Sequence, residues 1–208
     1  MSSARLPSGR HHLTREQVVG SQRRRILVAM ADAMMEKGYV GTSVAEIIRR
    51  AGVSRETFYQ QFRSKQDCFV QALDTGTELL AGLLELAADD ERDKDTGDRR
   101  LDPSAKFRRL MRIYLGTLAD EPALARVFLV EVYAAGPEAM EHRREGQRRF
   151  AEAIAEIFAA RTPQDRFSCE ALVAATAQLV TTHLITGDLD ALRALEDPLA
   201  ALADQLLG

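Results

Sequence analysis

Residues 42–65 restrict the possible folds of this chain more than any other segment. Val44, Ile47 and Ile48 share one face of a short expected helix. Gly52 follows this helix and supplies a tight turn, because glycine adopts backbone conformations that other residues avoid. A second short helix comes directly after the turn. Two short helices joined in this way have the spacing of a helix-turn-helix.

The second helix carries the side chains that give this motif its chemistry. Ser54 is a good N-cap for it, and Phe58 and Phe62 predict a small apolar core beneath it. Its other side chains are mostly polar and can hydrogen-bond to base edges or phosphates, as a helix in a DNA major groove does. Two short helices around a glycine also occur in all-α proteins that do not bind DNA, so the flanking sequence has to decide.

The charge of the chain is divided unevenly along its length. Residues 1–65 contain 12 Lys and Arg but only 5 Asp and Glu, which gives +7. Since the formal net charge of the whole chain is −3, residues 66–208 carry −10. A basic first third on an acidic remainder indicates that one end of the protein faces phosphates.

The composition favours an all-α fold in the cytoplasm. Ala, Leu, Glu and Arg dominate, and runs of β-branched residues bounded by turns are missing. Cys68 and Cys169 are expected to be reduced thiols. No apolar run approaches the roughly 18 residues of a transmembrane helix, and no apolar secretion signal opens the chain. Catalytic sets, Gly-rich phosphate loops and metal-ligand spacings are not evident, so we expect no enzyme, no cofactor and no metal.

Local start and stop signals predict about nine helices. Residues 1–13 are expected to form a disordered basic arm, and the charged residues 89–103 an exposed loop. Besides the two motif helices, helices are expected over about 14–37, 65–87, 104–118, 121–135, 137–160, 165–186 and 198–207.

Residues 26–69 resemble the tetracycline-repressor (TetR) family of bacterial transcriptional regulators. The resemblance lies in a helix that ends Met-Glu-Lys-Gly-Tyr and in the segments Thr-Ser-Val, Ile47-Ile48, Ala51-Gly52-Val53-Ser54, Thr57-Phe58-Tyr59, Phe62 and Ser64-Lys65. It covers about a fifth of the chain. The resemblance implies an N-terminal three-helix DNA-binding domain over 14–65, and a C-terminal helical ligand-sensing and dimerisation domain over 66–208.

The resemblance also implies which side chains hold DNA. Phosphate contacts are expected from the helix starts and from the family's tyrosine and lysine positions, and base contacts from the second motif helix. The candidates are Thr42, Ser43, Ser54, Arg55, Thr57, Tyr59, Gln60, Gln61 and Lys65. Glu56 and Gln61 depart from the family pattern, and the role of Glu56 stays open.

Candidates for an effector pocket and a dimer interface follow from the same resemblance. The expected pocket residues lie on the central helices: Met111, Tyr114, Phe128, Glu131, Tyr133, His142 and Phe150. Glu131 interrupts an apolar run, so it needs a ligand or a partner such as Arg143, unless it reaches solvent. The expected dimer contacts are Leu172, Thr176, Leu179, His183, Leu199, Leu202 and Leu206. Ala171, Ala174, Ala175 and Gln178 form a second, small-residue face on the same helix.

These expectations lead to one main hypothesis and two alternatives. The main hypothesis is a homodimeric regulator, most simply a repressor, that binds a near-palindromic DNA operator and is released by a small-molecule effector. One alternative is a helical enzyme or carrier with an incidental helix-turn-helix. The other is a DNA-binding protein that responds to no ligand.

Overall fold

The computed structural model describes residues 15–89 and 102–208, and these residues form helices without strands. The fold is therefore all-α, as predicted. The elements are α1 (Arg15–Gly41), α2 (Val44–Ala51), α3 (Arg55–Gln61), α4 (Lys65–Asp89), α5 (Pro103–Asp120), α6 (Pro122–Leu129), the 3-10 helix η1 (Glu131–Ala134), α7 (Pro137–Ile157), α8 (Pro163–Thr186), α9 (Leu189–Arg193) and α10 (Glu196–Leu207). The predicted basic arm lies outside the described residues, as does most of the predicted loop at 89–103.

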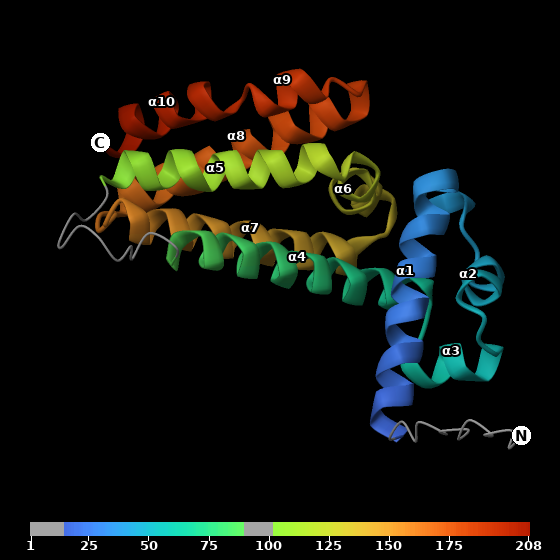
Figure 1. Cartoon of the computed structure of the whole chain (residues 1–208). Helices are drawn as coiled ribbons and strands as arrows, with labels where there is room; N and C mark the ends of the chain where they lie inside the picture. The colour runs from blue at the N-terminus through green and yellow to red at the C-terminus, as the bar shows by residue number, and fades with distance from the viewer. Residues whose placement is uncertain (1–14, 90–101) are drawn as a thin grey trace, which may run out of the picture.

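The helices are arranged in two parts that α4 connects. Figure 1 shows α1, α2 and α3 at one end of the molecule, while α5 and α7–α10 form an elongated bundle. The helix α4 leaves the first part and runs along α7 in the second (Figure 1). None of the helices in the described ranges is both long enough and apolar enough to span a membrane.

The helix-turn-helix forms at the residues that the sequence indicates. The hydroxyl of Ser43 accepts a hydrogen bond from the N–H of Glu46 and caps α2. Gly52 ends α2 in the left-handed conformation, with φ at 61°. The hydroxyl of Ser54 then accepts from the N–H of Thr57 at 3.0 Å and caps α3. Capping and the glycine turn therefore fix both ends of the motif locally.

The first of two buried clusters extends beyond the three N-terminal helices. Phe58 of α3 and Phe62, the residue directly after α3, are buried in it, as the sequence predicts. The cluster also includes Phe69 of α4, Val132 of η1 and Ala139 of α7. Consequently, the helix-turn-helix packs against the same core as the segment that follows α6. A second cluster, centred on Phe107, Leu115, Leu172, Leu184 and Leu192, fills the bundle.

The helix expected over residues 121–135 is broken in two. Helix α6 ends at Leu129, and η1 begins at Glu131. The β-branched residues Val130 and Val132 weaken a continued α-helix, and Glu131 is drawn to a partner in α1. The carboxylate Oε2 of Glu131 accepts a hydrogen bond from the N–H of Tyr39 at 2.7 Å. Tertiary contact therefore overrides the apolar pattern at this position.

Candidate nucleic-acid interface and effector cavity

Helix α3 buries its aromatic face and exposes its polar face. Phe58 is fully buried, whereas Arg55, Glu56 and Gln60 are exposed. Tyr59 keeps 45 % of its surface exposed although it is a large aromatic residue. An exposed tyrosine beside an arginine on a short, capped helix can contact both phosphates and bases.

Two contacts organise the exposed face of α3. The guanidinium carbon of Arg55 lies 5.3 Å from the ring centroid of Tyr59, a cation–π geometry. The amide nitrogen of Gln60 donates to the carboxylate Oε1 of Glu56 at 3.2 Å, one helical turn away. Glu56 thus restrains Gln60, which supplies an explanation for the acid at this position.

Thr42 is not available to DNA in the way that the sequence indicates. It is 2 % exposed, and its hydroxyl donates to the carbonyl of Gly38 at 2.8 Å. Its N–H donates to the carbonyl of Tyr39 at 3.3 Å. Both of its donors are used inside the protein, so the exposed cap residue Ser43 is the candidate that remains at this helix start.

Lys65 and Gln61 also turn partly inward. The ammonium of Lys65 donates to the carbonyls of Tyr39 and Thr42, at 2.7 and 2.9 Å, and lies 4.1 Å from the centroid of the Tyr39 ring. Burial lowers the pKa of this ammonium below its ordinary value. The side-chain oxygen of Gln61 is buried without a hydrogen-bond partner in the described residues. Neither group points freely toward a groove in this structure.

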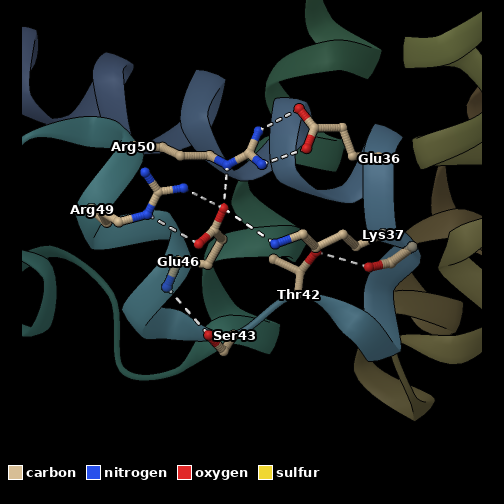
Figure 2. A network of polar contacts seen from close by, with 8 residues as sticks. Glu36, Lys37, Thr42, Ser43, Glu46, Arg49 and Arg50 are labelled. Carbon is tan, nitrogen blue, oxygen red and sulfur yellow. Dashed lines mark hydrogen bonds and ion pairs between the residues drawn. The ribbon is translucent and has the colours of Figure 1, made fainter.

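An ion-pair network holds α2 on α1. Figure 2 shows the carboxylate of Glu46 between Lys37, Arg49 and Arg50. Arg50 also pairs with Glu36 at 2.5 Å. Hydrogen bonds from Arg49 and Arg50 lower the pKa of Glu46 to about 2. Three of the 12 basic residues of the N-terminal segment are therefore paired with carboxylates of the protein itself.

A mostly apolar cavity of about 270 Å³ lies among α4, α5, α6, α7 and α8. Five of the seven expected pocket residues line it: Met111, Tyr114, Phe128, His142 and Phe150. Thr176, which was expected at a dimer interface, lines it as well. Its hydroxyl donates to the carbonyl of Leu172 within α8.

The other two expected pocket residues lie elsewhere. Glu131 binds the N–H of Tyr39 instead of a ligand or Arg143. Tyr133 is exposed, and its ring lies 5.2 Å from the guanidinium carbon of Arg143. Both corrections have one cause, because the break after α6 turns these side chains away from the cavity and toward α1 and α7.

The sequence interpretation missed the α4 wall of the cavity and Arg143. Gly76 and Thr77 interrupt the leucines of α4, and both line the cavity. A Cβ at Gly76 would lie 3.3 Å from the Phe128 ring, so glycine lets α6 approach α4 closely. A glycine in the apolar stripe of a long helix is the signal that was available.

The predicted dimer residues divide between the core and the surface. Leu172, Thr176 and Leu199 are buried in their own chain, so they do not lie on a surface that a partner can reach. His183 and Leu202 are partly buried, and Leu179 and Leu206 are exposed. The outward face of α8 includes three of the four residues of the second face in the sequence, Ala171, Ala174 and Gln178, whereas Ala175 is partly buried. Phe167, Thr182 and Ile185 extend this exposed face.

Comparison with known proteins supports this arrangement. Residues 26–72 match the family model described as bacterial regulatory proteins, tetR family. These residues include α2 and α3, which form the helix-turn-helix, and the start of α4. The match supports a transcriptional regulator of the TetR type.

The individual relatives of this chain are distant. It is 29 % identical over 141 residues to EthR of Mycolicibacterium smegmatis, which covers 67 % of this chain and 59 % of the relative. It is 25 % identical over 127 residues to RutR of Escherichia coli, covering 61 % and 55 %. The chain thus aligns with little more than half the length of these two regulators.

A solved structure extends the similarity to the whole fold. FadR from Bacillus subtilis, crystallised in complex with stearoyl-CoA, superposes with a TM-score of 0.68 at 21 % sequence identity. The match covers 86 % of this chain and 96 % of FadR. At this identity the likeness concerns the fold.

Proposed function

We propose that this protein is a homodimeric, ligand-responsive DNA-binding transcriptional regulator that acts as a repressor in the cytoplasm. The observation that carries the proposal is the outward face of α3, where Arg55, Tyr59 and Gln60 are exposed on a helix capped at Ser54. Residues 14–65 would hold DNA, and residues 66–208 would sense the effector and form the dimer. EthR and RutR, which are transcriptional regulators, support this function.

On the DNA side, each protomer would place α3 in a major groove. A twofold dimer would set the two α3 helices about 34 Å apart, or a multiple of it, on a near-palindromic operator. Arg55 suits guanine and Gln60 suits adenine, whereas Ser43, Ser54, Thr57 and Tyr59 would position the backbone. Glu56 would set the direction of the Gln60 amide.

On the effector side, the cavity among α4–α8 would hold a small molecule. FadR supports this role because it was crystallised with stearoyl-CoA. An effector releases DNA only if it binds the two conformations of the protein with different affinity. By linkage, DNA and effector would then weaken each other by the same factor.

The test is binding of purified protein to operators selected from a random pool of double-stranded DNA. We expect enrichment of a near-palindrome, and affinity that falls steeply with salt. Arg55→Ala combined with Tyr59→Ala should remove the preference for that sequence, because the double variant loses a base contact, which contributes about 1–3 kcal/mol of discrimination, and a backbone contact that positions α3. Glu141→Ala, an exposed change on α7, is the matched control.

The results also separate the alternatives. Unchanged sequence preference in the double variant would contradict the role of α3. A protein that binds small molecules but enriches no DNA would be the helical carrier or enzyme. Specific DNA binding that no small molecule changes would indicate the ligand-independent regulator.

A further inference from the structure

Arg143 differs from the other arginines of its helix. Arg144 pairs with Glu141, and Arg148 and Arg149 pair with Glu145. Arg143 has no carboxylate within ion-pair distance among the described residues, and its guanidinium stacks on the ring of Tyr133. It is half-buried and lines the cavity.

The sequence itself leaves this cation without a partner on its own helix. Helical neighbours lie three and four residues away. For Arg143 these positions hold Ala139, Met140, Gly146 and Gln147, none of which is acidic. The three exposed arginines of α7 have a glutamate at such a position. The charge of Arg143 therefore stays available to something other than the helix.

The groups around Arg143 favour an anion. Tyr114 lines the same cavity. Burial raises the pKa of its phenol more than the charge of Arg143 lowers it, and the resulting pKa is about 12. The hydroxyl is therefore a neutral donor. His142 is paired with Asp74 at 2.8 Å, so that nearby carboxylate already has a partner. Glu121 is the acid that lines the cavity, and it is exposed to solvent.

The remainder of the cavity is mostly apolar. Its walls include Leu80, Met111, Leu118, Phe128, Phe150, Ile154 and Val173. The lining residues of α7 run from His142 to Ile154, which is about 18 Å along a helix axis. An apolar lining over that length offers room for an extended acyl chain.

We propose that the cavity binds a straight-chain acyl amphiphile whose negative group contacts Arg143 and the Tyr114 hydroxyl while its chain extends along α7 toward Ile154. This inference rests on the proposed function, since it names the chemical class of the effector. The chain is held by burial of apolar surface. The negative group gains charge-assisted hydrogen bonds that a neutral group would not have. A free fatty acid and an acyl-CoA thioester share this chemistry.

The experiment compares ligands that differ only in their head group. Binding of dodecanoate, dodecanol and dodecanoyl-CoA is measured by calorimetry on the full-length protein, below the concentrations at which these molecules form micelles. We expect at least one of the anionic ligands to bind on the order of tenfold more tightly than dodecanol. Octanoate and hexadecanoate then report how chain length fits the cavity.

Variants connect the preference to Arg143. Arg143→Gln should abolish the difference between the anionic ligand and dodecanol, and Arg143→Lys should keep part of it. Arg144→Gln, the neighbouring exposed arginine, should change nothing. Circular dichroism and the melting temperature show whether each variant is folded, and Arg143→Lys keeps the test valid if the glutamine variant is not.

The outcomes have separate meanings. Tighter dodecanoate than dodecanoyl-CoA identifies the free acid as the ligand, and the reverse order identifies the thioester. Equal binding of dodecanol and both anions, an unchanged preference in Arg143→Gln, or binding of none of the three would overturn the proposal. Operator selection is measured independently, so a protein that selects DNA but binds no acyl chain loses this inference and keeps the proposed function.

Discussion

At the residue scale, side chains near the helix-turn-helix serve the protein's own structure as much as a DNA contact. Lys65 resembles a phosphate-binding lysine in the sequence. Its ammonium instead donates to the carbonyls of Tyr39 and Thr42, at the junction between α1 and α2. Thr42 lies at the same junction, and its hydroxyl donates a hydrogen bond to the carbonyl of Gly38. These two residues therefore orient the start of α2, which places Ser43 on the surface.

The role of Lys65 leads to a stability prediction. Lys65→Met would leave the carbonyls of Tyr39 and Thr42 without this donor, so the free energy of unfolding should fall by about 1–3 kcal/mol. Urea denaturation measures it, with the exposed Lys106→Met as control. Unchanged stability with strongly reduced DNA affinity would instead favour a direct phosphate contact.

Asp67 gives a prediction on pH. Burial raises the pKa of its carboxyl, but hydrogen bonds from the Arg63 N–H, the Gln71 amide and the Arg63 side chain together lower it below the ordinary value. A carboxyl with a lowered pKa stabilises the folded state above its unfolded pKa, near 3.9, and loses this contribution as the pH falls.

Asp67→Asn should therefore be less stable than the natural protein at neutral pH, and the difference should shrink as the pH falls below about 4. Thermal unfolding followed across this range measures the difference. A stability gap that is constant between neutral and acidic pH would show that ionisation of Asp67 contributes nothing. Asp190→Asn, which changes an exposed residue of the short helix α9, is the control.

At the element scale, η1 connects the cavity to the DNA-binding helices. Phe128 of α6 lines the cavity and lies 6.3 Å from Phe69, measured between ring centroids. Three residues later, Glu131 bonds to the N–H of Tyr39, just after Gly38 interrupts α1 with φ at 68°. A ligand that moves α6 would thus act on α1 through this contact.

Removing the carboxylate should uncouple the two sites. Glu131→Ala leaves the half-buried N–H of Tyr39 unpaired, so the free energy of unfolding should fall by about 1–3 kcal/mol. The factor by which an effector weakens operator binding should also fall. Glu131→Gln retains an acceptor oxygen and should behave more like the natural protein.

The measurement is operator affinity with and without a saturating effector, with Glu141→Ala as the exposed control. An unchanged coupling factor in Glu131→Ala would show that the signal reaches α1 by another route.

At the scale of the whole molecule, the outward face of α8 is the surface suited to a second copy. Phe167 is 64 % exposed and Ile185 is 56 % exposed, and the small side chains of Ala171 and Ala174 lie between them. An apolar, small-residue stripe on a long helix allows close approach of a twofold partner. Leu172, on the other side of α8, is fully buried in the chain's own core.

A bulky charge on this face should prevent assembly. Ala174→Arg should shift the protein to a monomer in sedimentation experiments, and operator affinity should fall because one protomer reads only one half-site. Ala153→Arg, on the exposed side of α7, should leave the mass of the sedimenting dimer unchanged. A dimer that persists in Ala174→Arg would place the interface elsewhere.

The sequence by itself determined the features that depend on neighbouring residues. Ser43, Gly52 and Ser54 fix the helix ends through bonds that span three or four positions, so the helix-turn-helix and the all-α fold were predictable. Helical periodicity likewise separated the buried Phe58 from the exposed Arg55. The match to the TetR family rests on this same segment.

Only the tertiary structure decided the features that join distant residues. Periodicity identified two faces of α8, but not which one packs on the rest of the chain, so Leu172 was expected at a dimer interface but is buried in the chain's own core. The partner of Glu131 lies 92 positions away in α1, and no local pattern specifies a contact of that range. Arg143 was visible as a cation, yet its importance depends on the apolar walls that five helices bring around it.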